Sequence, residues 1–173
     1  MLSIYLFLGL FAFLANCTPG TLYRADKRGP DVIHKAGGFI TRAHTNNAQQ
    51  VCSLADHQSQ TSANDPFIST SASGERAAGF LAKPPNMGNG WLYEIDSSKA
   101  GVKFHDCAKV SGTHQNEQEF AAEGNIPDTA IIACTEYTRN KPGKRITGCR
   151  PAPNPKPNIL AGYSRIYARN FVA

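Results

Sequence analysis

The sequence predicts an α+β domain built from short strands and short helices. Apolar and polar residues alternate over residues 91–95, which is the period of a half-buried strand. Helical patterns are short and lie between strand-like segments, as residues 75–82 lie between residues 67–70 and 91–95. The chain has 173 residues and shows no internal repeat, so we expect a single domain.

The first third of the chain contains one predicted strand and two predicted helices. Residues 21–25 form the strand. A proline precedes residues 31–36 and two glycines follow them, which is typical of a short helix. Residues 48–57 form the second predicted helix, and residues 58–66 a polar, mobile loop.

Most of the remaining elements are predicted strands. Residues 67–70 form a strand, and Ser73 is placed to cap the helix at residues 75–82. Two adjacent prolines and two glycines mark residues 83–90 as a loop. The later strands are predicted at residues 91–95, 102–104, 130–137 (a central strand) and 159–167, with an extended, proline-rich connector at residues 151–157.

The amino-terminal segment indicates a secreted protein. Residues 2–15 form an apolar run that is short for a membrane span, and Ala15-Asn16-Cys17 fits a small-x-small cleavage site. We therefore expect a secretory signal peptide at residues 1–17 and one domain at residues 18–173. A membrane anchor is the alternative, and we expect no stable membrane span.

Four cysteines remain after the signal peptide. An even number in a secreted chain indicates two disulfides, for which three connectivities exist. Cys134 and Cys149 flank a turn-like segment at residues 138–144, so we expect them to pair and to leave Cys52 with Cys107. The spacing of the cysteines fits no common zinc pattern, and we expect no metal site.

The formal net charge of +5 comes from the carboxyl-terminal part of the chain. No acidic residue follows Glu136, whereas basic residues recur through to Arg169. Such a surface can bind an acidic partner, a membrane or nucleic acid, or serve only to keep the protein soluble.

Glu117 and Glu119 are the residues that carry the most chemical information. Residues two apart in an extended segment point to the same face, about 6–7 Å apart. Two carboxylates so placed repel each other unless a cation, or a reaction that develops positive charge, lies between them. The alternative interpretation is a solvated strand edge.

An arginine in a short strand (Arg24), a Ser-Thr-Ser strand beginning at Ser69 and the Glu117-x-Glu119 pair occur in that order. This set resembles the Arg–Ser–Glu class of mono-ADP-ribosyltransferases, and is most similar to the enzymatic A chain of the cholera and heat-labile enterotoxin family. Residues 54–57 and 124–127 add to the similarity. The resemblance implies an ADP-ribosyltransferase-like fold of two packed, mostly antiparallel sheets around an NAD cleft, with residues 18–173 as the catalytic domain.

The resemblance also implies roles for individual residues. Glu119 would stabilise the positive charge that develops as the nicotinamide–ribose bond breaks, and Glu117 would orient and deprotonate the acceptor. Ser69 would orient Glu119, and His57 matches the active-site histidine of the family. The residues expected to hold NAD are Arg24, Ala25, Asp26, Gly38, Ser69, Thr70 and Glu119.

The predicted function is that of a secreted toxin or effector that uses NAD as a substrate and transfers ADP-ribose to arginine of a target protein. By resemblance, Glu-x-Glu accompanies arginine acceptors and Gln-x-Glu other acceptors, including guanine in DNA, so Glu117 makes nucleic acid an unlikely partner. The alternatives are an NAD glycohydrolase, a DNA-guanine modifier and a non-catalytic, disulfide-linked binding module. A separate binding subunit is a further expected partner.

Overall fold

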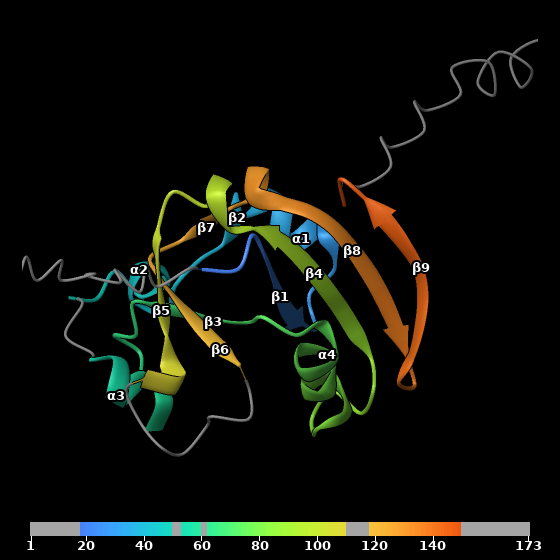
Figure 1. The fold of residues 1–173 in the computed structure, drawn as a ribbon, viewed down its shortest axis with the longest axis horizontal. Helices are drawn as coiled ribbons and strands as arrows, with labels where there is room; N and C mark the ends of the chain where they lie inside the picture. Colours follow the sequence, from blue (N-terminus) through green and yellow to red (C-terminus); the bar gives the residue numbers. More distant parts are fainter. Residues whose placement is uncertain (1–17, 50–52, 60–61, 110–117, 150–173) are drawn as a thin grey trace, which may run out of the picture.

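The computed structural model describes residues 18–49, 53–59, 62–109 and 118–149 (Figure 1). Seven strands form one antiparallel sheet in the order β5-β6-β3-β1-β4-β8-β9, and β2 and β7 form a second. The strands are β1 (Thr21–Asp26), β2 (Gly38–Phe39), β3 (Phe67–Ser71), β4 (Gly90–Asp96), β5 (Lys103–Asp106), β6 (Glu119–Glu123), β7 (Ile126–Pro127), β8 (Ile131–Thr138) and β9 (Lys141–Thr147). The helices are α1 (Pro30–Lys35), α2 (Arg42–Thr45), α3 (Leu54–Ser59) and α4 (Gly74–Ala82). The predicted class, α+β with antiparallel sheets, is confirmed.

The large sheet is divided at the boundary between β1 and β3. These two strands pair only at Tyr23 and Ser71, whereas β1 pairs with β4 along its whole length from Thr21 to Asp26. Figure 1 shows β5, β6 and β3 on one side of this boundary and β1, β4, β8 and β9 on the other. The division leaves a gap in the hydrogen-bonded ladder, and side chains from both halves meet there.

The core lies between the large sheet and the small one. Leu22, Tyr93 and Ile95 are fully buried on β1 and β4, and Phe39 and Ile126 are buried on the small sheet. The rings of Phe39 and Tyr93 meet edge to face, with centroids 5.2 Å apart. This contact fixes the small sheet against the large one.

Several predicted elements are confirmed in detail. Strands occupy residues 21–25, 67–70 and 91–95 as expected, each extended by one residue or two. The side chain of Ser73 caps α4 by accepting a hydrogen bond from the backbone nitrogen of Arg76. The strand predicted at residues 130–137 is β8, which is paired on both sides, by β4 and β9.

The helix predicted at residues 48–57 is wrong in its position. Helix α3 begins at Leu54, because Ser53 and Asp56 cap it: the Ser53 backbone nitrogen donates to Asp56 Oδ2, and the Asp56 nitrogen to Ser53 Oγ. Ala48 instead lies after α2, a short helix that the sequence did not predict. Gln58 and Ser59, expected in a loop, belong to α3.

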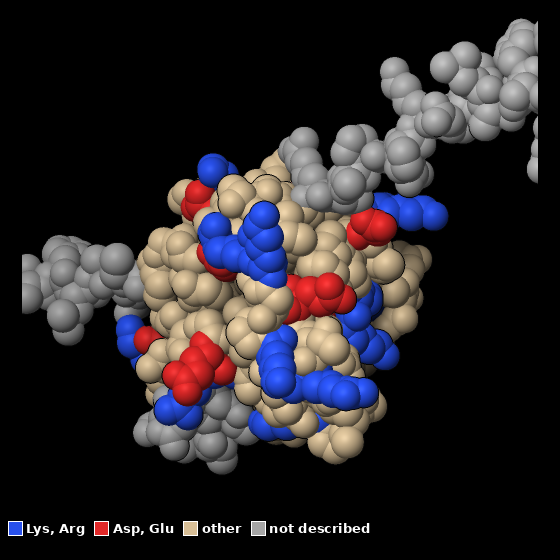
Figure 2. Space-filling model, turned by 90° about the vertical axis from the view of Figure 1, so that its right-hand side faces the viewer, with Lys and Arg blue, Asp and Glu red and all other residues tan. Residues whose placement is uncertain are grey.

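The segment expected to be a turn at residues 138–144 is mostly a strand. Only Arg139 and Asn140 form the turn, both with positive φ, as tight hairpins require. Lys141 then begins β9, an edge strand whose residues are all exposed. Figure 2 shows this side of the molecule, where basic side chains outnumber acidic ones. Arg145, on β9, is paired with Glu94, with Nη2 2.7 Å from Oε2.

The structure confirms one of the two expected disulfides. Cys134 and Cys149 are bonded and link β8 to the end of the hairpin. The pairing of Cys107 with Cys52 is wrong, because Cys107 is a free, buried thiol that contacts the carbonyl of His105 at 3.7 Å. Cys52 itself lies outside the described residues.

Other predictions also fall outside the described residues: the signal peptide at residues 1–17, the connector at 151–157 and the strand at 159–167. Within the described residues, no helix is long and apolar enough to cross a membrane.

Candidate active site

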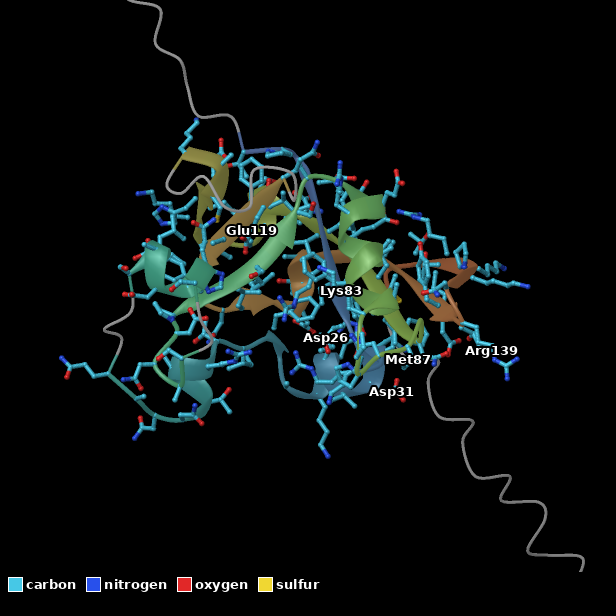
Figure 3. All side chains as sticks on the ribbon, turned by 90° about the horizontal axis from the view of Figure 1, so that it is seen from below. Asp26, Asp31, Lys83, Met87, Glu119 and Arg139 are labelled. Carbon is cyan, nitrogen blue, oxygen red and sulfur yellow. A yellow bond between two sulfur atoms is a disulfide. The ribbon has the colours of Figure 1, made fainter. Side chains whose placement is uncertain are left out.

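A cleft of about 440 Å³ opens where β1 and β3 diverge. Four of the five residues predicted to be catalytic line it: Arg24 on β1, His57 on α3, Ser69 on β3 and Glu119 at the start of β6. They come from four elements that are distant in sequence. Figure 3 shows Glu119 well apart from Asp26, which lies at the far end of β1.

Glu119 is a largely buried carboxylate held by hydrogen-bond donors. Its side chain is 12% exposed, and its Oε1 lies 3.4 Å from Nε2 of His57. Burial alone would raise the pKa of Glu119, but hydrogen bonds from His57 and Ser69 and the charge of His57 outweigh it and lower the pKa below its usual value. The carboxylate is therefore ionised at neutral pH, although little water reaches it.

His57 is placed between two carboxylates. Its Nδ1 lies 2.8 Å from Oδ2 of Asp65, and its Nε2 lies 3.0 Å from Oγ of Ser69 as well as near Glu119. Burial would lower the pKa of His57, but the hydrogen bonds to Glu119 and Asp65 outweigh it and raise the pKa. His57 thus carries a positive charge over a wider pH range than a free histidine does.

Arg24 spans the division between β1 and β3. Its Nη1 donates to the backbone oxygen of Ser69 at 2.7 Å, and its guanidinium lies 5.2 Å from the centre of the Phe39 ring. Burial lowers the pKa of Arg24, partly offset by the charge of Asp26 3.6 Å away. Its Nε is buried and has no hydrogen-bond partner among the described residues.

Asp26 acts on the cleft through Arg24. It accepts two side-chain hydrogen bonds from Arg28, from Nε at 2.9 Å and from Nη2 at 2.7 Å. Burial would raise the pKa of Asp26, but the Arg28 hydrogen bonds and the Arg24 charge outweigh it and lower the pKa. Asp26 is not among the residues that line the cleft, so it orients Arg24 from behind.

The remaining residues predicted to hold NAD differ in their placement. Ala25 and Thr70 line the cleft, and the Thr70 hydroxyl donates to the backbone oxygen of Phe120 at 2.6 Å. Gly38 does not line the cleft. A Cβ at Gly38 would clash with the backbone of Ile126, and its φ is +125°, so packing between β2 and β7 accounts for this glycine.

The expected geometry of the acid pair needs correction at Gln118. Its φ of +48° is left-handed, so the extended conformation assumed for the pair does not run through Gln118, and β6 begins only at Glu119. Glu117 lies outside the described residues. The expectation that the two carboxylates share one strand face is therefore not supported.

Sequence reasoning missed several residues of the site. Asp65, in the segment expected to be a mobile loop, is 4% exposed and orients His57. Arg42 and Gln58 line the cleft, and Cys107 lies against Glu119. The sequence did contain one signal for Asp65: the run Asn64-Asp65-Pro66 directly before the strand, because Asp followed by proline favours a defined turn.

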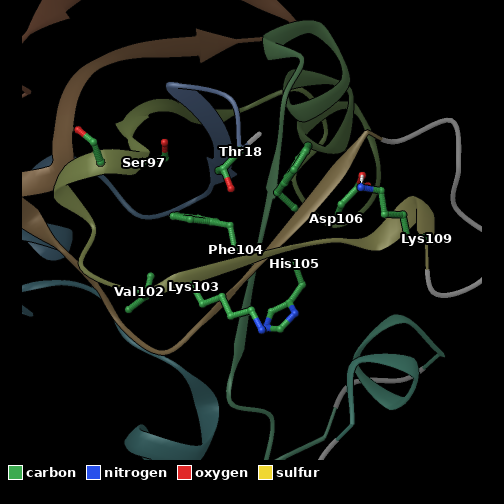
Figure 4. Close-up of a pocket in the computed structure, with 10 residues that line it drawn as sticks. Thr18, Ser97, Val102, Lys103, Phe104, His105, Asp106 and Lys109 are labelled. Atoms are coloured by element: carbon green, nitrogen blue, oxygen red, sulfur yellow. Dashed lines mark ion pairs between the residues drawn. The ribbon is translucent and has the colours of Figure 1, made fainter. Parts of the chain in front are cut away.

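A second, larger cavity of about 610 Å³ contains none of the predicted site residues. Figure 4 shows Phe104, Asp106 and Lys109 along it, and Phe120 also contributes to its lining. Phe120 follows Glu119 on β6, and successive side chains of a strand point to opposite faces, so this cavity lies behind the sheet from Glu119. Among the described residues, no cluster that could hold a metal ion is found in either place.

Comparisons with known proteins agree with this geometry. The Scabin-like family model matches residues 22–156. The heat-labile enterotoxin A chain of Escherichia coli is 30% identical over 138 residues, which cover 73% of this chain and 53% of the enterotoxin chain. This chain thus spans about half the length of that curated relative.

Solved structures support the same fold. A heat-labile enterotoxin mutant from E. coli superposes with a TM-score of 0.61 at 27% identity, covering 73% of this chain and 74% of that one. A guanine-specific ADP-ribosyltransferase gives a TM-score of 0.60 at 23% identity, covering 79% and 80%. The Scabin toxin of Streptomyces scabies in complex with NADH gives 0.59 at 20% identity, covering 78% and 76%. With the fold of ADP-ribosyltransferase toxins and a match over most of its length, this chain belongs to the Scabin-like family.

Proposed function

We propose that this chain is a toxin that cleaves NAD, releases nicotinamide and transfers ADP-ribose to arginine of a target protein. The observation that carries the proposal is Glu119: an ionised, mostly buried carboxylate held by His57 and Ser69 in a cleft that Arg24 borders. Buried carboxylates with lowered pKa values are typical of sites that stabilise a developing positive charge.

The residues of the cleft fit NAD as the substrate. Arg24 and Arg42 are cations that suit a diphosphate, and Arg24 Nε is a buried donor without an acceptor among the described residues. As the bond between nicotinamide and ribose breaks, its electron pair leaves with nicotinamide and the ribose carbon becomes positively charged. Glu119 stabilises that carbon electrostatically, as carboxylates do in glycosidases.

Arginine is the acceptor favoured by Glu117. An arginine side chain stays protonated at neutral pH and attacks only if a base removes its proton. A carboxylate at position 117 can accept that proton, whereas an amide there could not. The second candidate acceptor is guanine in DNA, which the likeness to a guanine-specific enzyme favours.

Nicotinamide release from labelled NAD tests the proposal, with three reactions run side by side. One contains an arginine analogue, one contains guanine-bearing DNA and one contains buffer alone. The proposal expects label on the arginine analogue. Label on DNA would support the second candidate, and nicotinamide release without transfer would identify a glycohydrolase.

The proposal also covers the secretion of the chain and a partner subunit. We infer that residues 1–17 are a signal peptide and that a separate binding subunit delivers the chain into a host cell. Sequencing the amino terminus of the exported protein tests the first point, and a start near Thr18 is expected.

A further inference from the structure

Gln58, the residue after His57 on α3, lines the same cleft as the Glu119 carboxylate and has no role in the reaction described above. The amide nitrogen Nε2 donates to the backbone oxygen of Cys107 at 3.4 Å, and the amide also acts on Glu119 as a donor that helps to lower the pKa of that carboxylate. Both partners are acceptors, and this fixes the orientation of the amide, because only Nε2 can donate to them.

The other end of the amide has no such partners. Oε1 of Gln58 is buried and accepts no hydrogen bond from any described residue. A buried carbonyl without a donor destabilises the folded chain, so an apolar side chain of similar size would be more stable here. Stability therefore does not account for a glutamine at this position, and the Nε2 contacts do.

We propose that Gln58 is a positioning residue that holds the Glu119 carboxylate in place, anchored by the backbone oxygen of Cys107. The inference rests on the proposed function, since it assigns Gln58 a part in NAD cleavage. Cys107 begins a short 3-10 helix directly after β5, and β5 pairs with β6, the strand of Glu119. Gln58 thus ties α3 to the part of the sheet that carries Glu119.

The neutral amide of Gln58 can remain a hydrogen-bond donor at a pH where His57 and Ser69 no longer donate to Glu119. Asp65 accepts a hydrogen bond from Nδ1–H of His57, so a neutral His57 carries no hydrogen on Nε2, which then accepts a hydrogen bond and no longer donates one to Glu119. The Ser69 hydroxyl lies 3.0 Å from that Nε2 and can then donate to it, so it no longer donates to Glu119. The amide of Gln58 does not titrate, so it remains a donor toward Glu119 when His57 loses its proton.

The test compares Gln58→Met, which removes the donor but keeps the length, with Gln58→Glu, which keeps the shape but adds a charge. Ser59→Ala is the matched control, because Ser59 is exposed on the same helix and its hydroxyl donates to the backbone oxygen of Asp56 in that helix. Nicotinamide release from NAD is measured against pH, with thermal unfolding to confirm that each variant is folded. We expect kcat of Gln58→Met to fall on the order of 10–100-fold, the cost of a misplaced catalytic group, with KM for NAD within about threefold.

The pH profiles distinguish positioning from a structural role. Above the pH at which His57 loses its proton, wild-type activity should fall to a residual level, and Gln58→Met should fall well below that level. Gln58→Glu should lose most activity near neutral pH, where its carboxylate repels Glu119. Parallel profiles for wild type and Gln58→Met, or a loss confined to KM, would overturn the inference. If the wild type itself released no nicotinamide, the proposed function would fail first, so the two failures are distinguishable.

Discussion

The imidazole Nε2 of His57 lies 3.4 Å from Oε1 of Glu119, and both side chains are close to fully buried. The contact raises the pKa of His57 and lowers that of Glu119, in each case against the effect of burial. Glu119 stabilises the folded protein above its ordinary pKa, and this contribution is lost as pH falls through its lowered pKa. His57 stabilises the folded protein below its ordinary pKa, and this contribution is lost as pH rises through its raised pKa. The ion pair is therefore present between the lowered pKa of Glu119 and the raised pKa of His57.

The first prediction is a bell-shaped dependence of kcat on pH that follows this ion pair. Activity should fall in acid as Glu119 takes up a proton, at a pH below the usual range for a glutamate. It should also fall on the alkaline side as His57 loses its proton, at a pH above the ordinary value for a histidine. Nicotinamide release across the pH range measures both limits.

Asp65→Asn tests the source of the alkaline limit. Removing this carboxylate removes a cause of the raised pKa of His57, so the alkaline limit should move to lower pH while the acid limit stays near its place. His105→Gln is the control, because His105 pairs with Glu123 and does not line the cleft. An unchanged alkaline limit in Asp65→Asn would show that another group sets it.

Arg24→Lys should reduce kcat/KM for NAD by about 100-fold, although the charge is kept. A lysine presents one ammonium and cannot both bond to the Ser69 carbonyl and offer the remaining donors of a planar guanidinium. Arg28→Lys is a matched control: Arg28 binds the same Asp26 but does not contact Ser69. Steady-state kinetics of the two variants measure the difference, and equal losses in both would contradict a specific role for Arg24.

The Cys134–Cys149 disulfide should stabilise the fold without taking part in catalysis. It closes a loop with a sequence separation of 15, for which the chain-entropy model gives about 3 kcal/mol. His34 Nε2 also contacts the backbone oxygen of Cys149 at 2.6 Å, so loss of the bond should loosen α1 as well. Denaturant unfolding of the Cys134→Ala/Cys149→Ala variant measures this, and a change under about 1 kcal/mol would argue against the model.

Cys107 should resist alkylation in the folded protein. Its side chain is 1% exposed, and burial, aided by the charge of Glu119, raises the pKa of the thiol to about 12. The reactive thiolate is therefore scarce at neutral pH. Mass spectrometry after iodoacetamide treatment should find Cys107 unmodified when native and modified when unfolded. Rapid labelling of the native protein would contradict the burial.

The sequence predicted the elements whose local pattern matches their burial. The strand at residues 91–95 is an example, because Tyr93 and Ile95, two residues apart on one face of it, are fully buried. It did not predict β9, because every residue of that edge strand is exposed and Pro142-Gly143 is typical of a turn. The order of Arg24, Ser69 and Glu119 indicated the site, but Asp65 and Gln58 join it only through the way α3 lies against the sheet.

Substitution of Glu119 and of Glu117 should affect different steps, cleavage of the nicotinamide–ribose bond and transfer of ADP-ribose to the acceptor. Glu119→Gln should lose nicotinamide release and transfer together, on the order of 10²–10³-fold, because the charge at the ribose carbon is then unsupported. Glu117→Gln should lose arginine modification yet keep measurable NAD hydrolysis, since a base for the acceptor is not needed to break the nicotinamide–ribose bond. Assays of both variants with and without an arginine analogue, and with guanine-bearing DNA, decide between them. Glu123→Gln is the matched control, because Glu123 lies on the same strand but pairs with His105. If Glu117→Gln lost hydrolysis and transfer equally while remaining folded, the two carboxylates would not divide the reaction in this way.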